Sequence, residues 1–397
     1  MNVGIAVHQY AASEGTGGYV VELLPRIAGV HRVTLYAARI AAPVPPGVQV
    51  VRVPTVMRRA YSAILTFPLG LRLVRQPHDL FHVQGWISPS ADVVTAHIVM
   101  AAWRDAARAA RVATPPGERT LGRFVQAREA SLLRRARRVI APSSKVREEI
   151  ARWYGRTSGV SVVHHGFPAT AGAAGAVAPV GPDGRVSASA VSAAAATTAE
   201  ALQRPEGPTG PPAAAARRSL GLPLDGTIAL FVGDLRKGFD TALEAVKQVP
   251  GVRLAVVTRS PRRPVMERAE RAGMLDRLHW IGALEDVTAA YHAADFLLHP
   301  TIYDAFGLVV AEAMAHGLPP VVTGAAGITE LMRHGESGWL VEGDSAAGTL
   351  AAVRTLAQDG GLRRRLGAGA RAAAARRSWD DVARETLVVY QEALESR

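Results

Sequence analysis

Short apolar runs alternate with helix-length segments along this chain, and the alternation occurs twice. The first series of runs begins at Val3, Arg32, Val48, Asp79, Asp92, Arg138 and Val160, and the second at Thr227, Val252, Leu278, Asp295, Pro319 and Gly338. Unbroken apolar strands separated by helices are typical of parallel sheets that are covered on both faces. The two series therefore predict two doubly wound α/β domains that face each other across a cleft.

The stretch from Ala169 to Ala216 interrupts this pattern. It consists of small residues with Pro and Gly and almost no large apolar side chains, so it cannot fill a core. A structureless stretch of this length is uncommon inside a domain, and we interpret it as a flexible linker or insertion. The predicted division is a first Rossmann-like domain over 1–168, the low-complexity linker over 169–216 and a second Rossmann-like domain over 217–377.

Composition excludes several classes of protein. Of the 397 residues, 48% are hydrophobic and 20% charged, which suits substantial cores rather than a disordered or fibrous chain. The absence of cysteine excludes disulfide scaffolds, thiolate metal sites and cysteine nucleophiles. The opening MNVGIAVHQY lacks a basic region, and the apolar stretch 62–74 is too short to span a bilayer. We expect no signal peptide and no spanning helix, and a cytoplasmic protein.

A net charge of +12 makes anionic partners plausible, among them nucleotides, phospholipid surfaces and nucleic acid. The excess is almost entirely arginine, and no zinc-finger, RRM or KH signature occurs, so we do not predict nucleic acid binding. The segment VMRRAYSAILTFPLGLRLVRQ, from residue 56 to 76, leaves two interpretations open. It is either a buried helix of the first domain or a peripheral contact with an anionic membrane surface near an acceptor.

Ligands of doubly wound folds bind beyond the carboxyl ends of the strands, so the loops after each run are searched first. After the first run, Gly17 and Gly18 open an amphipathic helix. Glycines there allow close approach of the backbone to a phosphate or sugar, although a purely structural turn is the favoured interpretation of a lone glycine turn. Val20 stands where the dinucleotide fingerprint needs glycine, which disfavours a nicotinamide enzyme.

The second domain opens with FVGDLRKGFD, in which Arg236 and Lys237 follow a predicted buried strand. Two cations between Gly233 and Gly238 are suited to hold a diphosphate. A solvated turn is the competing interpretation.

The segment TIYDAFGLVVAEAMAHGLPPVV runs from a strand through a polar turn into an apolar helix that begins near Phe306 or Gly307. Glu312 lies about a turn and a half inside this helix among apolar residues, where a carboxylate is costly unless it finds donors. A ribose diol offers two hydroxyl donors, and a buried salt bridge to an arginine is the alternative. Asp304, in the turn, is placed to hold sugar hydroxyls.

In this order the pieces resemble the donor domain of retaining glycosyltransferases of the GT-B fold, family 4. The resemblance rests on the basic pair at 236–237, the acid-to-Glu helix motif DAFGLVVAEAMAHGLP, the turn from Gly327 to Glu330 and GWLV from Gly338. The first half is similar more loosely, through its glycine loop, VVTAHI, APSSKVREEI and VVHHGF. The tail SWDDVARETLVVYQEAL, within 378–397, resembles the final helix that crosses back onto the first domain.

The resemblance implies a retaining, metal-independent hexosyltransferase without a cofactor, which moves a sugar from a nucleoside-diphosphate sugar to an acceptor hydroxyl in polysaccharide or glycoconjugate biosynthesis. The acceptor is a glycan, a lipid-linked molecule or a small molecule. The implied catalytic residues are His97, Arg236, Lys237 and Asp304. The implied donor-binding residues are Gly17, Gly18, Gly233, Phe306, Gly307, Leu308 and Glu312.

Three positions depart from the pattern of the resembled family. Asp304 stands where Glu is usual, Asp234 where an Arg is common and His165 where Asn is usual. Two alternatives therefore remain open: a catalytically weak sugar-nucleotide-binding protein, and a sugar-nucleotide epimerase of the same fold.

Overall fold

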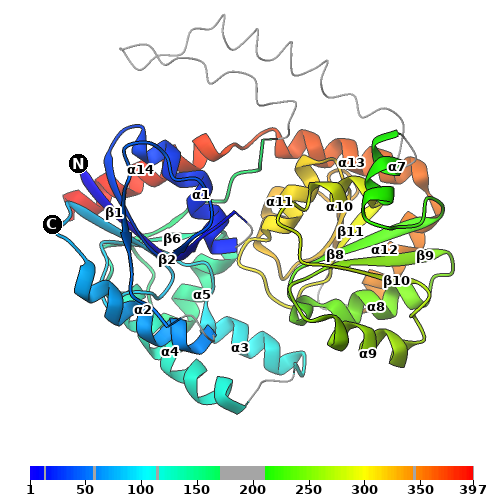
Figure 1. Cartoon of the computed structure of the whole chain (residues 1–397), viewed down its shortest axis with the longest axis horizontal. Coiled ribbons are helices and arrows are strands. Elements are labelled where there is room, and N and C mark those ends of the chain that lie inside the picture. The colour runs from blue at the N-terminus through cyan, green and yellow to red at the C-terminus, as the bar shows by residue number, and fades with distance from the viewer. Residues whose placement is uncertain (13–14, 57–59, 113–115, 170–210, 343–345, 397) are drawn as a thin grey trace, which may run out of the picture.

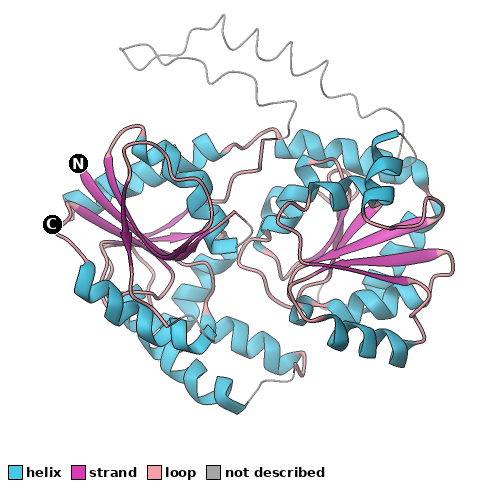
Figure 2. Ribbon diagram, viewed as in Figure 1, coloured by secondary structure: helices cyan, strands magenta, loops and turns pink. Residues whose placement is uncertain are grey.

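The computed structural model describes residues 1–12, 15–56, 60–112, 116–169, 211–342 and 346–396. Two α/β domains lie side by side, each with a central sheet and helices on both of its faces (Figures 1 and 2). The fold class predicted from the alternating runs is confirmed.

The first domain is built on a sheet of parallel strands. Its strands are β1 (Asn2–Tyr10), β2 (Arg32–Ile40), β3 (Gln49–Arg52), β4 (Leu80–Gln84), β5 (Val93–Thr95), β6 (Arg138–Ala141) and β7 (Val160–Val162). Its helices are α1 (Gly15–Ala28), α2 (Ala60–Val74), α3 (Met100–Ala109), α4 (Pro116–Arg135) and α5 (Ser144–Tyr154), joined by the terminal helix α14 (Trp379–Glu395).

The second domain repeats this plan. Its strands are β8 (Thr227–Val232), β9 (Val252–Val257), β10 (Leu278–Gly282), β11 (Phe296–His299), β12 (Pro320–Thr323) and β13 (Trp339–Val341). Its helices are α7 (Pro211–Ser219), α8 (Phe239–Lys247), α9 (Arg262–Ala272), α10 (Thr288–Ala293), α11 (Leu308–Ala315), α12 (Ala346–Gln358) and α13 (Gly360–Ala374), with short 3-10 turns η1 (Leu235–Lys237) and η2 (Gly327–Leu331).

The two sheets have corresponding strand orders. The first runs β3-β2-β1-β4-β5-β6-β7 and the second β10-β9-β8-β11-β12-β13. In each, the opening strand is central and the order reverses beside it, between β1 and β4 and between β8 and β11. Ligands of such sheets bind at this reversal, beyond the carboxyl ends of the strands. The loops that follow these strands carry most of the predicted site residues.

The unbroken apolar runs arise because each strand is buried on both faces. In β8, Ile228 and Leu230 pack with α10, α11 and α13, while Ala229 and Phe231 pack with α8, α9 and α12 on the opposite face. Successive strand residues point to opposite faces, so both sets must be apolar. Each sheet is therefore the middle of three layers.

Helix α14 ends the described chain but packs on the first domain. Trp379 and Tyr390 are buried in the core formed by β1 and α1. The Tyr390 hydroxyl is 2.8 Å from Nδ1 of His82 on β4, and Glu392 pairs with Arg138 at 3.1 Å. The terminal helix crosses back to the first domain, as the resemblance implied.

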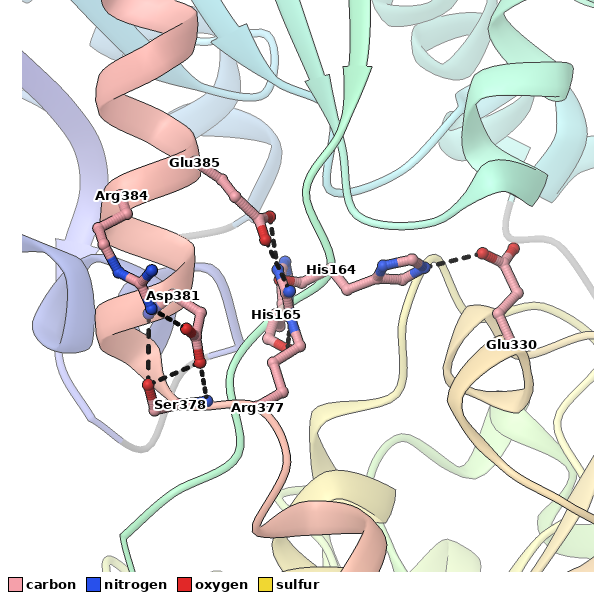
Figure 3. A network of polar contacts seen from close by, with 8 residues as sticks. All are labelled: His164, His165, Glu330, Arg377, Ser378, Asp381, Arg384 and Glu385. Carbon is pink, nitrogen blue, oxygen red and sulfur yellow. Dashed lines mark hydrogen bonds and ion pairs between the residues drawn. The ribbon is translucent and has the colours of Figure 1, made fainter. Parts of the chain in front are cut away.

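Two stretches of chain cross between the domains and are fastened to each other by Arg377 (Figure 3). Its guanidinium donates to the carbonyl oxygens of His164 and His165, at 3.0 and 3.3 Å from Nε, and pairs with Glu385 through two bonds of 2.8 and 2.7 Å. The amide of Phe167 in turn donates to the Arg377 carbonyl at 3.3 Å. The outgoing and returning segments thus form one double connection.

Most of the predicted linker, from 170 to 210, lies outside the described residues. Its last six residues belong to α7, so the predicted boundary at 216 is too late. Ala213 and Ala216 are buried as α7 packs against α10. Small side chains here allow close helix packing, and the alanine-rich composition that suggested a linker instead suits a helix.

Helix α2 is buried on one face and exposed on another. Ala63, Phe67 and Leu71 are buried on one face. Leu65, Leu69 and Leu73, also four residues apart, are 43, 66 and 82% exposed on the other. Arg58 and Arg59 lie outside the described residues. In the described part of the chain, no helix combines the length and apolar character needed to cross a bilayer.

A buried carboxylate caps the start of α3. Oε2 of Glu129, on α4, accepts from the Met100 amide at 2.8 Å and from the hydroxyl of Tyr154, which also accepts from the Ala101 amide. Burial raises the pKa of Glu129 to about 7, against the opposing effect of these two bonds. Glu129 thus ties α3, α4 and α5 together but is costly to ionise.

This cost predicts a pH-dependent stability. Because the folded-state pKa of Glu129 is raised, its contribution is fully present below about pH 4.5 and is lost as the pH rises through about 7. The loss amounts to about 3 kcal/mol for a pKa change of this size. Glu129→Gln keeps an oxygen acceptor and cannot ionise, so the free energy of unfolding of wild type should fall relative to the variant between pH 4.5 and 8.

Urea unfolding at pH 5 and pH 8 measures this difference. Glu395→Gln, at an exposed position of α14, is the control and should show no such change relative to wild type. An equal pH dependence in wild type and Glu129→Gln would contradict the prediction.

Candidate functional site

The candidate site lies between the domains, and its centre is an ion pair. Nζ of Lys237, in η1, is 2.8 Å from Oδ2 of Asp304, in the loop after β11. Nε2 of His299 lies 3.2 Å from the same oxygen. Burial alone would raise the pKa of Asp304, but the Lys237 charge and the bond to His299 outweigh it and hold the pKa well below its ordinary value.

Gly238 makes this pairing possible. Its φ is +96°, and a Cβ there would lie 2.0 Å from the carbonyl oxygen of Pro300. Only glycine permits both the left-handed conformation and the close approach. The η1 turn therefore lies directly against the loop that carries Asp304.

Arg236 faces a different carboxylate. It pairs with Asp234 at 2.9 Å, and Asp234 also accepts from the Arg236 amide at 2.9 Å as the cap of η1. The guanidinium lies 5.8 Å from the ring centroid of Trp103, on α3 of the opposite domain. The two cations predicted to hold a diphosphate are thus each matched by an aspartate in this arrangement.

Glu312 lies on α11 with a tyrosine as its partner, not the arginine considered from the sequence. The hydroxyl of Tyr291, on α10, donates to Oε2 of Glu312 at 2.6 Å. The ring of His316 stacks on Tyr291 with centroids 5.5 Å apart. Burial raises the pKa of Glu312, with a further increase from Asp286, while the Tyr291 bond opposes both. Tyr291 therefore fixes the orientation of this carboxylate.

The start of α11 has no side-chain cap from its N-cap residue. Gly307, at φ +108°, precedes the helix, and no side chain caps its first amides. Helix N-termini with uncapped amides bind phosphates. Phe306 is buried, while Leu308 is half-buried and packs against core residues of both domains. Gly233 has φ +130° and open space where a Cβ would be.

The glycines after β1 allow close packing of α1. A Cβ on Gly17 would lie 2.5 Å from the Gln9 carbonyl oxygen, and one on Gly18 would lie 2.9 Å from that of Ala12. This packing accounts for both glycines without a ligand. Their contact with a donor stays a prediction.

His97 follows β5 and belongs to a buried chain of polar groups. Its Nε2 is 2.8 Å from Oε1 of Gln84, whose amide nitrogen is 3.3 Å from Nε2 of His82, and His82 contacts Tyr390 of α14. The amide oxygen only accepts, so Nε2 of His97 carries the proton and Nδ1 is the acceptor. Desolvation lowers the pKa of His97 to about 3, so its ring is neutral at pH 7.

His165 lies in an aromatic cluster where the chain crosses between domains. Its ring centroid is 4.7 Å from Phe306, 4.8 Å from Tyr19, 5.7 Å from His97 and 6.0 Å from Trp379. It is 3% exposed, and neither of its ring nitrogens has a hydrogen-bond partner among the described residues. Burial lowers the pKa of His165 well below its ordinary value.

Glu330 joins the second domain to the first (Figure 3). Its carboxylate accepts from the amides of Ser144 and Lys145, both at 2.9 Å, and lies 2.9 Å from Nε2 of His164. It thereby caps α5 from the opposite domain. Beside it, the Ser143 hydroxyl donates to the Ala305 carbonyl at 2.9 Å.

The structure thus brings Lys237, Asp304 and His299 into contact and places Arg236 over the opposite domain. His97 lies on the first domain's side of the site, and Glu312 on the helix that follows the Asp304 loop. The sequence interpretation missed the partners Tyr291, Gln84 and His299. Gln84 is the last residue of a predicted strand, so its position at the carboxyl edge of the sheet could have been predicted from the sequence. The contact of Tyr291 with Glu312 could not, because the two residues are distant in sequence.

Two family models match the chain. Residues 13–170 match Glycosyltransferase Family 4, and residues 226–359 match Glycosyl transferases group 1. Together these matches cover well over half of the chain, which belongs to this glycosyltransferase family.

Similar curated proteins carry a consistent description. A D-inositol 3-phosphate glycosyltransferase of Xylanimonas cellulosilytica is 37% identical over 193 residues, 46% of this chain and 46% of that protein. The chain thus matches about half the length of this relative. A D-inositol 3-phosphate glycosyltransferase of Streptomyces bingchenggensis is 28% identical over 435 residues, 96% of this chain and 85% of that protein.

Solved structures share the fold. WaaG, a glycosyltransferase involved in lipopolysaccharide biosynthesis, has TM-score 0.74 at 19% identity, covering 97% of this chain and 98% of that one. Sucrose-phosphate synthase of Thermosynechococcus elongatus has a TM-score of 0.75 at 19% sequence identity, covering 100% of both chains. Anabaena HepE in complex with UDP and glucose has a TM-score of 0.69 at 15% sequence identity, covering 98% of this chain and 99% of that one. These likenesses confirm the GT-B fold.

The lowered pKa predicts that His97 does not titrate near neutrality. Its ring should stay neutral from pH 8 down to below pH 5, because burial disfavours the imidazolium. Nitrogen-15 NMR of histidine-labelled protein measures this, with His97→Ala to assign the signal. The exposed Arg108→His provides an internal control ring on α3 that should titrate near 6.5. A His97 midpoint above pH 5.5 would contradict the prediction.

Proposed function

We propose that this glycosyltransferase-family chain transfers a sugar from a nucleoside-diphosphate sugar to an acceptor hydroxyl with retention of configuration. The carrying observation is the Lys237–Asp304 ion pair of the second domain, in which Asp304 lies three residues before Gly307 at the start of α11. Family membership supports the reaction class, and the binding of UDP and glucose by the similarly folded HepE supports a nucleotide-sugar donor.

Each group has a role that suits its position. Lys237, with Arg236, and the first amides of α11 meet the diphosphate charge, which grows as the glycosidic bond breaks. Glu312, held by Tyr291, accepts the ribose hydroxyls. Asp304 accepts hydroxyls of the donor sugar, and His97 contacts the sugar or the acceptor from the opposite domain.

Retention needs no nucleophile from the protein in this proposal. The acceptor oxygen attacks the anomeric carbon from the face that the diphosphate leaves, so one C–O bond forms as the other breaks. The acceptor proton passes to an oxygen of the departing diphosphate. The charge is met by the chain's own cations and amides, and we propose that no metal ion is required.

A second candidate is a catalytically weak sugar-nucleotide-binding protein. It is favoured by the pairing of Arg236 with Asp234, which offsets a cation that would otherwise face the diphosphate. An enzyme and a binding protein differ in whether an added acceptor drives nucleotide release.

The test begins with thermal-shift measurements of UDP, GDP, ADP and their glucose conjugates. The stabilising donor is then incubated with D-inositol 3-phosphate and with simple glycosides as acceptors. Acceptor-dependent release of nucleoside diphosphate, a product anomer matching the donor by NMR and persistence in EDTA are the expected results. Binding without release favours the weak binder, and conversion of the donor sugar without acceptor favours an epimerase.

Three variants separate binding from chemistry. Glu312→Gln should weaken nucleoside diphosphate binding by about 1.5 to 3 kcal/mol, roughly 10- to 150-fold in Kd, because it weakens the acceptor for two hydroxyls. His97→Ala should leave that Kd nearly unchanged and reduce transfer. Lys237→Met should impair both, because the diphosphate charge is present before and during bond breaking.

Calorimetry and the transfer assay provide the measurements, with Lys247→Met, an exposed lysine of α8, as the control. Wild-type transfer by His97→Ala, or unchanged nucleotide binding by Glu312→Gln, would show that these assignments are wrong.

We also propose that the exposed face of α2 contacts an anionic membrane surface. Its leucines at 65, 69 and 73 project from one side of the helix beside exposed Arg72, a combination that suits the boundary of an anionic bilayer. This contact would leave the helix lying on the surface.

Flotation with phosphatidylglycerol-containing vesicles tests this contact. Wild type should float more as the anionic fraction rises, and the double variant Leu69→Ser/Leu73→Ser should float at least several-fold less, because apolar area is lost. Leu224→Ser, which changes a leucine that is 52% exposed on the second domain, is the matched control. Flotation that does not depend on the anionic lipid fraction of the vesicles would contradict the proposal.

A further inference from the structure

Tyr303 belongs to the second domain in sequence but to the first domain in packing. It lies in the loop after β11, between Ile302 and Asp304. Its side chain is 4% exposed and forms part of the core cluster of the first domain, with residues of α3, α4 and α5. The loop therefore inserts an aromatic side chain across the interface.

The Tyr303 hydroxyl accepts one hydrogen bond and donates another, both with residues of the first domain. It accepts from the Val99 amide at 2.9 Å and donates to Oε2 of Glu149 at 3.0 Å. Val99 precedes α3, and its own side chain cannot cap the helix. Glu129 and Tyr154 accept from the next two amides, and Tyr303 accepts from the Val99 amide. The bond joins a side chain of one domain to the backbone of the other.

The ring is held as firmly as the hydroxyl. Nζ of Lys145, on α5, lies 3.9 Å from the ring centroid and pairs with Glu149 at 2.8 Å. Trp103 of α3 contacts the ring with a centroid distance of 6.1 Å. Tyr303 thus contacts an indole, a cation and a carboxylate, of which the last two also pair with each other, so several groups together set its position.

The residues joined by this hydrogen bond, Tyr303 and Val99, lie close in sequence to two of the predicted catalytic residues. Asp304 is the residue after Tyr303, and His97 is two residues before Val99. The Tyr303 side chain therefore fixes the backbone next to Asp304 in the second domain and near His97 in the first. Displacement of Tyr303 would alter both positions at once.

We infer that Tyr303 is a positioning residue that couples closure of the two domains to the alignment of Asp304 with His97. The inference rests on the proposed transfer reaction, because it gives the alignment its purpose. Tyr303 packs in the core cluster of the first domain, whereas Tyr291, the partner of Glu312, packs in a core cluster of the second domain. Tyr303 should therefore affect the chemical step and the interdomain distance, and leave nucleotide affinity nearly unchanged.

Tyr154 provides a matched control within the same cluster. It is also a buried tyrosine whose hydroxyl accepts from an amide of the first turn of α3 and donates to a glutamate. It comes from the first domain itself. Tyr154→Phe thus removes the same kind of bond from α3 without removing a link between domains.

The experiment compares wild type, Tyr303→Phe and Tyr154→Phe. The chain contains no cysteine, so Gln49→Cys and Asp276→Cys, exposed positions on opposite domains, accept one spin label each. Pulsed electron resonance then reports the distribution of interdomain distances. Tyr303→Phe should broaden this distribution toward longer distances, and Tyr154→Phe should match wild type.

The kinetic arm uses the donor and acceptor found for wild type. Tyr303→Phe should lower kcat about tenfold and change the nucleoside diphosphate Kd by less than threefold, with a circular dichroism spectrum like that of wild type. An unchanged distance distribution, or a wild-type kcat, overturns the inference. Absence of transfer by wild type would instead contradict the proposed function, and the distance measurement remains decisive for the coupling because it needs no donor.

Discussion

The geometry of the site depends on the clasp that Arg377 forms between the two crossings of the chain. Each domain is a three-layer unit, and contacts between the domains, among them those of Glu330 and Tyr303, contribute to their relative orientation. The Arg377 guanidinium bonds two successive carbonyls of the outgoing segment and a carboxylate of α14. Charge-assisted bonds of this kind are stronger and more directional than neutral ones. The carboxyl edges of both sheets consequently face each other.

The electrostatics of the interdomain site are balanced rather than simply cationic. Lys237 pairs with Asp304, and Arg236 pairs with Asp234. In the proposed reaction, a diphosphate must compete with these aspartates for the cations. When it takes Lys237, the Asp304 carboxylate is released to accept hydrogen bonds from the hydroxyls of the sugar. Donor binding is then an exchange of partners, in which leaving group and sugar are recognised together.

Much of the fold follows from periodicity, because burial on both faces leaves an unmistakable pattern in strands such as β8. The site follows in part: Asp304, Glu312 and the cation pair are local in sequence, at loops that strand direction brings to one edge. Their partners are not local. Tyr291 meets Glu312, and Tyr303 meets Val99, through tertiary packing that no spacing encodes. Helix α7 was missed because alanines suit both a linker and a closely packed helix.

The return of α14 to the first domain has a consequence for how this protein is made. The core of the first domain includes Trp379, Val389 and Tyr390, which are synthesised after the whole of the second domain. During translation the second domain can close its core while the earlier one still exposes the apolar groove that α14 will fill. The order of completion thus runs against the order of synthesis, and a ribosome that stops shortly before Trp379 would release a finished second domain attached to an unfinished first.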